Sequence, residues 1–263
     1  MHISYSELIL LNKPVVENVK KLSEDGCGRI ELMMDGQSWD SYKTNFTPLV
    51  RELKELNLSY SVHPAAWDIN LTAETEILRR AAFEHHLQAL DFCAELGAKQ
   101  MVVHPGFANS PCFNKAQAQE RAHDAILALA EQAKKVDVKL AFENVGYHGA
   151  SIYTQDEFIH ALDGVDGIVG YLIDIGHAHI NQWDIPEVIR TLSDRMFGFH
   201  IHDNNGSKDE HRPIGEGNVD WAGVVGAMRE VKNTSCEFIL EYVPFTPLEK
   251  LAEGKSFIES QLK

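Results

Sequence analysis

The chain has 263 residues, and 24 Lys and Arg stand against 39 Asp and Glu, which gives a formal net charge of −15. This acidic surplus makes nucleic acid an unlikely partner, because a DNA- or RNA-binding face has to neutralise phosphates with Lys and Arg. A hydrophobic content of 44% is that of an ordinary globular protein, which excludes a disordered chain.

Apolar runs and cysteines bear on the cellular compartment. No apolar run approaches the roughly 20 residues that span a bilayer. The N-terminus lacks the basic segment and the small-residue cleavage site of a signal peptide. The four cysteines form no CxxC pair, so reduced thiols are expected. We therefore expect a cytoplasmic protein with no membrane partner.

Short apolar runs alternate along the chain with longer amphipathic segments. The expected strands are His2–Ser6, Gly28–Met33, Leu58–His63, Lys99–His104, Val138–Glu143, Val169–Asp174, Met196–His202 and Glu237–Tyr242. The expected helices are Pro14–Asp25, Thr44–Leu56, Ala73–Gly97, Asn114–Val136, Gln155–Leu162, Ile185–Asp194, Trp221–Lys232 and Pro247–Gln261. Thr154 and Glu157 match a capping box, and Gly97 is a typical C-cap.

Eight strands that alternate with eight helices in a chain of this length predict an α/β fold, a (β/α)8 TIM barrel with a single domain over residues 1–263. A doubly wound open sheet is the competing architecture. No GxGxxG motif follows the first expected strand to support that alternative.

Side chains that can bind a metal stand at or near the ends of six consecutive expected strands. They are His63, His104, Glu143, Asp174, His200 and Glu241. In a closed parallel barrel the C-terminal ends of all strands surround one mouth, so these residues should meet in space. A single histidine after a strand is more often a hydrogen-bonded core residue than a ligand. Six in succession predict a metal site.

The inner four of these residues favour a particular chemistry. Glu143, Asp174, His200 and Glu241 offer three carboxylates and one imidazole, which suit Zn²⁺, Mn²⁺, Co²⁺ or Mg²⁺. A metal that binds a hydroxyl and a neighbouring carbonyl stabilises an enediolate after a carbon-bound proton leaves. Glu143 and Glu241 could then act as catalytic base and acid. Alternatively, these carboxylates only balance the charge of the metal.

Two further sets could hold metals of their own. His177 stands three residues after Asp174, and with Asp209 and His211 it would make a second N/O site. His63 and His104, bridged by Glu143, would make a third. Alternatively, these outer residues bind substrate and orient the inner ligands. We expect one to three divalent ions in each chain.

Four residues are candidates for substrate binding. They are His177, Arg212, His148 and Trp67. Arg212 could anchor a substrate oxyanion or form a salt bridge with Glu216, and Trp67 could form an apolar wall. We expect a structural role for His202, Arg or Lys partners for Glu31, and surface positions for the helical histidines, which include His86.

At these residues the sequence resembles the xylose isomerase-like TIM-barrel superfamily, which contains sugar isomerases and epimerases and the type IV apurinic endonucleases. The resemblance covers nearly the whole chain. It is carried by F-E-N at 142–144, I-D-I-G-H at 173–177, F-H-I-H-D at 199–203, D-E-H-R-P-I-G-E-G at 209–217 and I-L-E-Y at 239–242.

The resemblance implies one of two metal arrangements. Epimerase-like members use one metal on the Glu/Asp/His/Glu set, whereas the endonucleases use three zincs on nine positions, all of which have counterparts here. The acidic charge and the lack of basic loops argue against a nuclease. We therefore expect a metal-dependent isomerase or epimerase that acts on a small ketose, polyol or sugar phosphate through a metal-stabilised enediolate. A tri-zinc endonuclease or a metal-dependent dehydratase are the alternatives, and the chain could pair as a homodimer.

Overall fold

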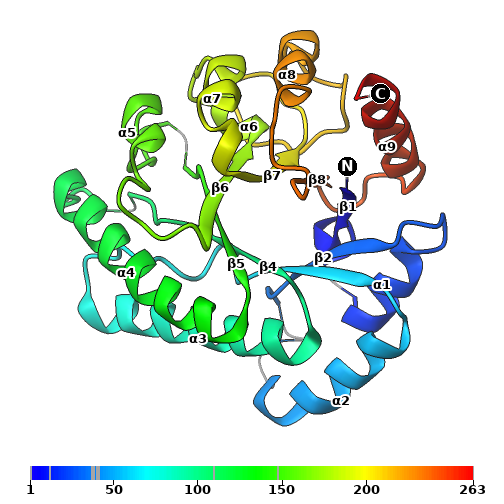
Figure 1. The fold of residues 1–263 in the computed structure, drawn as a ribbon, viewed down its shortest axis with the longest axis horizontal. Helices are drawn as coiled ribbons and strands as arrows, with labels where there is room; N and C mark the ends of the chain where they lie inside the picture. The colour runs from blue at the N-terminus through cyan, green and yellow to red at the C-terminus, as the bar shows by residue number, and fades with distance from the viewer. Residues whose placement is uncertain are drawn as a thin grey trace.

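The computed structural model describes residues 2–11, 13–36, 39, 42–108, 110–146 and 148–262. Eight parallel strands close into a barrel in which each strand pairs with the next and the last pairs with the first. Helices surround this barrel (Figure 1). The predicted TIM barrel is confirmed.

The described elements follow the expected alternation of strand and helix. The strands are β1 (His2–Ser6), β2 (Arg29–Met33), β3 (Ser59–His63), β4 (Gln100–Val103), β5 (Lys139–Glu143), β6 (Val169–Asp174), β7 (Met196–Ile201) and β8 (Glu237–Leu240). The helices are η1 (Glu7–Leu10), α1 (Val15–Leu22), α2 (Tyr42–Glu55), α3 (Glu76–Leu96), α4 (Lys115–Val136), α5 (Gln155–Ile159), α6 (Ile175–Ile180), α7 (Ile185–Thr191), η3 (Ser193–Arg195), α8 (Trp221–Met228) and α9 (Glu249–Gln261).

The local signals for helix ends are largely confirmed. The capping box of Thr154 and Glu157 is present, and Gly97 ends α3 with a positive φ of 83°. The start of α3 was predicted three residues too early, at Ala73. Both the backbone N–H and the hydroxyl of Thr72 bond to Asn70 Oδ1, at 2.9 Å each, which holds this segment in a loop. Helix α6 was not predicted, because its six residues are too few to show a helical period.

Four apolar side chains pack in the barrel interior below the ends of the strands. Val102, Ala141, Leu172 and Ile239 pack together and are fully buried. Each stands two residues before a predicted site residue, and residues two apart on a strand share a face. The barrel interior therefore supports the site from below with packed side chains.

Among the described residues, no helix combines the length and the apolar character that crossing a membrane requires.

Candidate metal centre

The C-terminal ends of the strands bring the predicted residues together. His63, Glu143 and Asp174 are the last residues of β3, β5 and β6, while His104 and Glu241 stand one residue beyond β4 and β8. The remaining predicted ligands are His200 in β7, His177 in α6, and the loop residues Asp209 and His211. Each of the nine has a ligand atom near that of at least one other.

The central cluster is arranged around His200. Its Nδ1 atom lies 3.1 Å from Glu143 Oε1, 3.5 Å from Glu241 Oε2 and 3.9 Å from Asp174 Oδ2. The Nε2 atom donates instead to Glu31 Oε1 at 3.1 Å. This bond leaves Nδ1 as the ring nitrogen that faces the three carboxylates. An imidazole fixed in this way is ready to ligate a cation.

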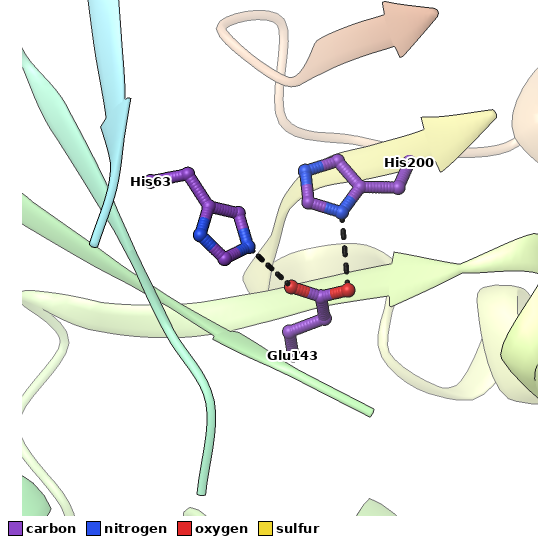
Figure 2. Close-up of side chains that lie close together, drawn as sticks. All are labelled: His63, Glu143 and His200. Atoms are coloured by element: carbon purple, nitrogen blue, oxygen red, sulfur yellow. Dashed lines mark hydrogen bonds and ion pairs between the residues drawn. The ribbon is translucent and has the colours of Figure 1, made fainter. Parts of the chain in front are cut away.

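A second cluster forms on the other oxygen of Glu143. His104 Nε2 lies 3.0 Å from Glu143 Oε2, and His63 Nε2 lies 3.6 Å from the same oxygen. Figure 2 shows His63 and His200 approaching the two carboxylate oxygens of Glu143 from different sides. The Nε2 atoms of His63 and His104 are 3.1 Å apart, so both cannot carry a proton there. Glu143 therefore lies between two sets of possible ligands, as predicted.

The third cluster joins α6 to the loop after β7. The Asp174 side chain caps α6 by accepting from the backbone N–H of His177, at 2.6 Å, which explains the three-residue spacing in the sequence. His177 Nε2 and His211 Nε2 lie 3.2 Å and 3.1 Å from Asp209 Oδ2. Their Nδ1 atoms lie 3.0 Å and 3.1 Å from the backbone carbonyls of Asn144 and Glu241. Donation to these carbonyls leaves both Nε2 atoms facing the carboxylate of Asp209.

The spacing of these atoms fits a bound ion. A tetrahedral zinc with bonds of about 2.0–2.1 Å needs its ligand atoms roughly 3.3 Å apart. The distances among His63, His104 and Glu143 Oε2 are 3.0, 3.1 and 3.6 Å, and those from Asp209 to His177 and His211 are 3.2 and 3.1 Å. The buried Oδ1 atom of Asp209 also has no hydrogen-bond partner. The donors present therefore suit divalent cations.

The electrostatics of the mouth also favour positive charge. Burial disfavours a charged imidazole at His200, but the carboxylates of Glu241, Glu143 and Glu31 outweigh this and raise its pKa well above the ordinary value. Burial is likewise outweighed at His63, where Glu143 raises the pKa to about 9, and at His211, where Asp209 raises it to about 9. A divalent cation would supply the same positive charge at these points.

Asp203 holds the loop that carries Asp209 and His211. Its buried carboxylate accepts from the backbone N–H groups of residues 204, 215 and 219 and from the indole N–H of Trp221, at 2.8–3.2 Å. The backbone of Asp203 also pairs with that of Arg212 in an isolated bridge. The loop is long, but this carboxylate fixes both of its ends.

Two predicted substrate contacts do not line the mouth. Arg212 forms an ion pair with Glu210 and donates to the carbonyl of Glu216 at 3.1 Å. The predicted salt bridge to the Glu216 side chain is also not the one seen. His148 Nε2 lies 2.6 Å from the carbonyl of Ser207, and His148 is not among the residues that line the cavity described below.

His202 and Glu31 contact the predicted metal ligands, although the sequence did not place either of them in the site. His202 is completely buried, its Nε2 lies 3.0 Å from Asp174 Oδ2, and its ring stacks on His211 with centroids 3.8 Å apart. The H-I-H spacing already carried this signal, because residues two apart on a strand share a face. Glu31 bonds to His200 rather than to Arg or Lys, and local sequence gives no sign of that pairing.

A cavity of about 370 Å³ opens directly above the clusters. Seven predicted site residues contribute to its polar wall: His63, His104, Glu143, His177, Asp209, His211 and Glu241. Its apolar wall includes Leu8, Met33, Trp67, Phe107 and Val145. This volume suits a small molecule, since ligand pockets typically measure about 300–1,000 Å³.

Comparisons with known proteins place this geometry in a family. The family described as "Xylose isomerase-like TIM barrel" matches residues 19–261. The uncharacterised protein MJ1311 of Methanocaldococcus jannaschii is 26% identical over 240 residues, which cover 88% of this chain and 80% of that protein. A probable endonuclease 4 of Thermoplasma volcanium is 28% identical over 227 residues, which cover 81% of this chain and 77% of that protein.

The solved structure of a D-tagatose 3-epimerase-like protein has the same fold. It superposes with a TM-score of 0.86 at 23% identity and covers 100% of this chain and 97% of its own. The family match, the barrel and the buried His, Glu and Asp clusters agree with one another. This chain belongs to the xylose isomerase-like TIM-barrel family, as a metal-binding enzyme of the superfamily that includes sugar epimerases and endonuclease IV.

Proposed function

We propose that this protein is a divalent-metal-dependent isomerase or epimerase of a small ketose or related polyol. The observation that carries the proposal is the placement of two carboxylates. Glu143 and Glu241 both approach His200 Nδ1 and both line the cavity, although they come from β5 and from the end of β8. Two strands separate their positions, so their carboxylates can reach different sides of one substrate carbon.

Proton transfer at carbon would use these two groups. A divalent ion held by Glu143, Asp174, His200 and Glu241 would act as a Lewis acid that polarises a substrate carbonyl. One carboxylate would take the proton from the neighbouring carbon and later release it to solvent. The other, protonated beforehand from solvent, would donate its proton to the far face or to the next carbon. The apolar side chains of Leu8 and Met33 line the cavity and would limit the access of water to the intermediate.

The cavity suits a small neutral polyol. No Lys or Arg stands among the described residues that line it. Its imidazoles and carboxylates can donate to and accept from hydroxyl groups, while Trp67 and Phe107 offer apolar faces. The epimerase-like neighbour with the same fold adds support for a sugar.

A phosphoester hydrolase is the second candidate, and a specific observation favours it. The clusters of His63 with His104 and of His177 with Asp209 and His211 flank the central one, and adjacent metals are typical of enzymes that displace phosphate esters. The endonuclease 4 relatives have this activity in their name. The acidic charge of the chain counts against a DNA substrate.

Three measurements separate the candidates. Metal analysis of the purified protein should give close to one Mn, Co or Mg per chain for the isomerase, whereas close to three zincs would favour the hydrolase. Incubation with ketoses in deuterated water should then label the carbon next to the carbonyl. Cleavage of an abasic-site oligonucleotide without any such exchange would overturn the proposal.

A further inference from the structure

A second cleft of about 600 Å³ adjoins the metal-lined cavity. It lies between the β3–α3 loop, the first turns of α3 and the loop after β4. Trp67 and Phe107 line both spaces and therefore form their common border. We propose that this cleft binds a second sugar ring, glycosidically linked to the ring that reacts over the metal centre. This inference rests on the proposed isomerase or epimerase function.

The surface of the cleft is apolar where a sugar ring could stack. The Trp67 side chain is 61% exposed and that of Leu78 is 59% exposed, which makes them two of the large apolar side chains that solvent reaches most. Phe107 and Phe113 add aromatic surface to the lining. The C–H face of a sugar ring packs well on an exposed indole, since such sites combine apolar walls with a few polar groups.

The charged groups of the cleft select against a phosphate. Asp68, Glu74 and Glu84 line it, and no Lys or Arg is among its described lining residues. Carboxylate oxygens accept hydrogen bonds from sugar hydroxyls but repel an anion. Arg121 pairs with Glu74 at 3.4 Å from outside the lining. The cleft therefore suits a neutral, hydroxylated ring rather than a phosphorylated extension.

The cleft is held in shape by one bond between its two loops and another within the β3–α3 loop. Asn70 Nδ2 donates to the carbonyl of Phe107 at 2.8 Å, and Asn70 Oδ1 accepts from the Thr72 hydroxyl at 2.9 Å. Gly106 allows this contact, because a Cβ atom there would lie 2.2 Å from Thr72 Oγ1. A site fixed in this way loses little entropy when a ligand binds.

The test compares three substrates that differ only in their extension: a free ketohexose, the same ketohexose carrying a galactosyl group, and its phosphate ester. For the wild-type protein we expect the galactosyl ketose to have a kcat/KM at least about tenfold above that of the free ketose. We expect the kcat/KM for the phosphate ester to be lower than the values for the other two substrates. Equal values for the free and galactosyl ketoses would overturn the inference while leaving the proposed function intact.

Ala81→Phe is the informative variant, because Ala81 is exposed, lines the cleft and does not line the metal-lined cavity. This variant should lower the kcat/KM for the galactosyl ketose to the value for the free ketose, and it should leave the kcat/KM for the free ketose unchanged. Leu127→Ala, at another exposed apolar position on α4 outside both spaces, is the matched control and should change neither. An equal loss for both substrates in Ala81→Phe would overturn the inference.

Binding separates this inference from the proposed function. If no ketose is turned over, the proposed function fails. Calorimetry then measures whether the neutral galactosyl ketose binds to the cleft. Binding to the metal-loaded wild type that Ala81→Phe weakens about tenfold would uphold the second site. Binding that is absent, or equal in the two proteins, would overturn it.

Discussion

The carboxylate of Glu31 accepts a hydrogen bond from His200 Nε2 at 3.1 Å, although 169 positions separate the two residues. Both side chains are completely buried. The bond determines which nitrogen of His200 faces the three carboxylates of the central cluster. Glu31 therefore acts on the metal centre through the orientation of another side chain.

Glu31→Leu should weaken metal binding at the central cluster by about 10–100-fold, because residues that orient a ligating histidine typically contribute this much. Glu31→Gln should have a smaller effect, since its amide oxygen can still accept from Nε2. Competition with a zinc chelator measures both affinities. If Glu31→Leu bound metal as tightly as the wild type, the orienting role would be refuted.

Glu143→Gln and Glu241→Gln should each lower turnover by about 10²–10⁴-fold, because each removes a carboxylate that we propose to transfer a proton. The far-ultraviolet circular dichroism should stay unchanged. Glu237→Gln, at the opposite end of β8, is the matched control and should retain activity. A fully active double variant of Glu143 and Glu241 would end the assignment.

Gly176→Ala should destabilise the protein by about 1–3 kcal/mol, because a Cβ atom at Gly176 would lie 2.0 Å from His202 Cε1 in a buried, packed region. Gly226→Ala is the control. A Cβ atom at Gly226 would meet nothing within 4 Å, and the residue lies inside α8. That change should stabilise the protein by about 0.5–1 kcal/mol. Urea unfolding measures both, and equal effects would contradict the steric explanation.

Asp203→Asn should lower the free energy of unfolding by about 3 kcal/mol or more. The amide would place its N–H groups against the four N–H donors that now bond to the carboxylate. It should also weaken metal binding by Asp209 and His211, whose loop it releases. Asp220→Asn, at the N-cap of α8, should be nearly neutral because Asn caps helices as well as Asp does. Unchanged thermal unfolding of Asp203→Asn would show that the loop has other anchors.

Glu7 should make the free energy of unfolding depend on pH. Burial outweighs its bonds to Asn18 and Met33 and raises the pKa from 4.5 to about 7. The folded state then binds more protons than the unfolded state between these values, so this contribution is complete below pH 4.5 and is lost as the pH rises through 7. Its size is on the order of 3 kcal/mol.

Glu7→Gln isolates that contribution. It removes the titration and also weakens one of the two hydrogen bonds. The stability deficit of Glu7→Gln relative to the wild type should therefore be largest near pH 5 and smaller near pH 8. A deficit that is the same at both pH values in urea titrations would show that Glu7 does not titrate in this range.

Much of the site could be predicted from the sequence. Alternation of strands and helices determined the barrel, and a parallel barrel gathers the ends of its strands, so His63, Glu143 and Asp174 had to meet. The period of two along a strand also places His202 on the same face as His200. These features depend on local periodicity, which a sequence displays directly.

Other features depended on the tertiary structure. His86 was expected on the surface of its helix but is 2% exposed, because packing around α3 decides which positions are covered. Arg212 pairs with Glu210 and is not among the residues that line the cavity, a pairing that depends on how the loop held by Asp203 folds. The sequence alone determined which residues at the strand ends gather at the mouth of the barrel. Only the closed barrel decided that Glu31 meets His200, because the strands that carry them come together through the packing of the whole ring.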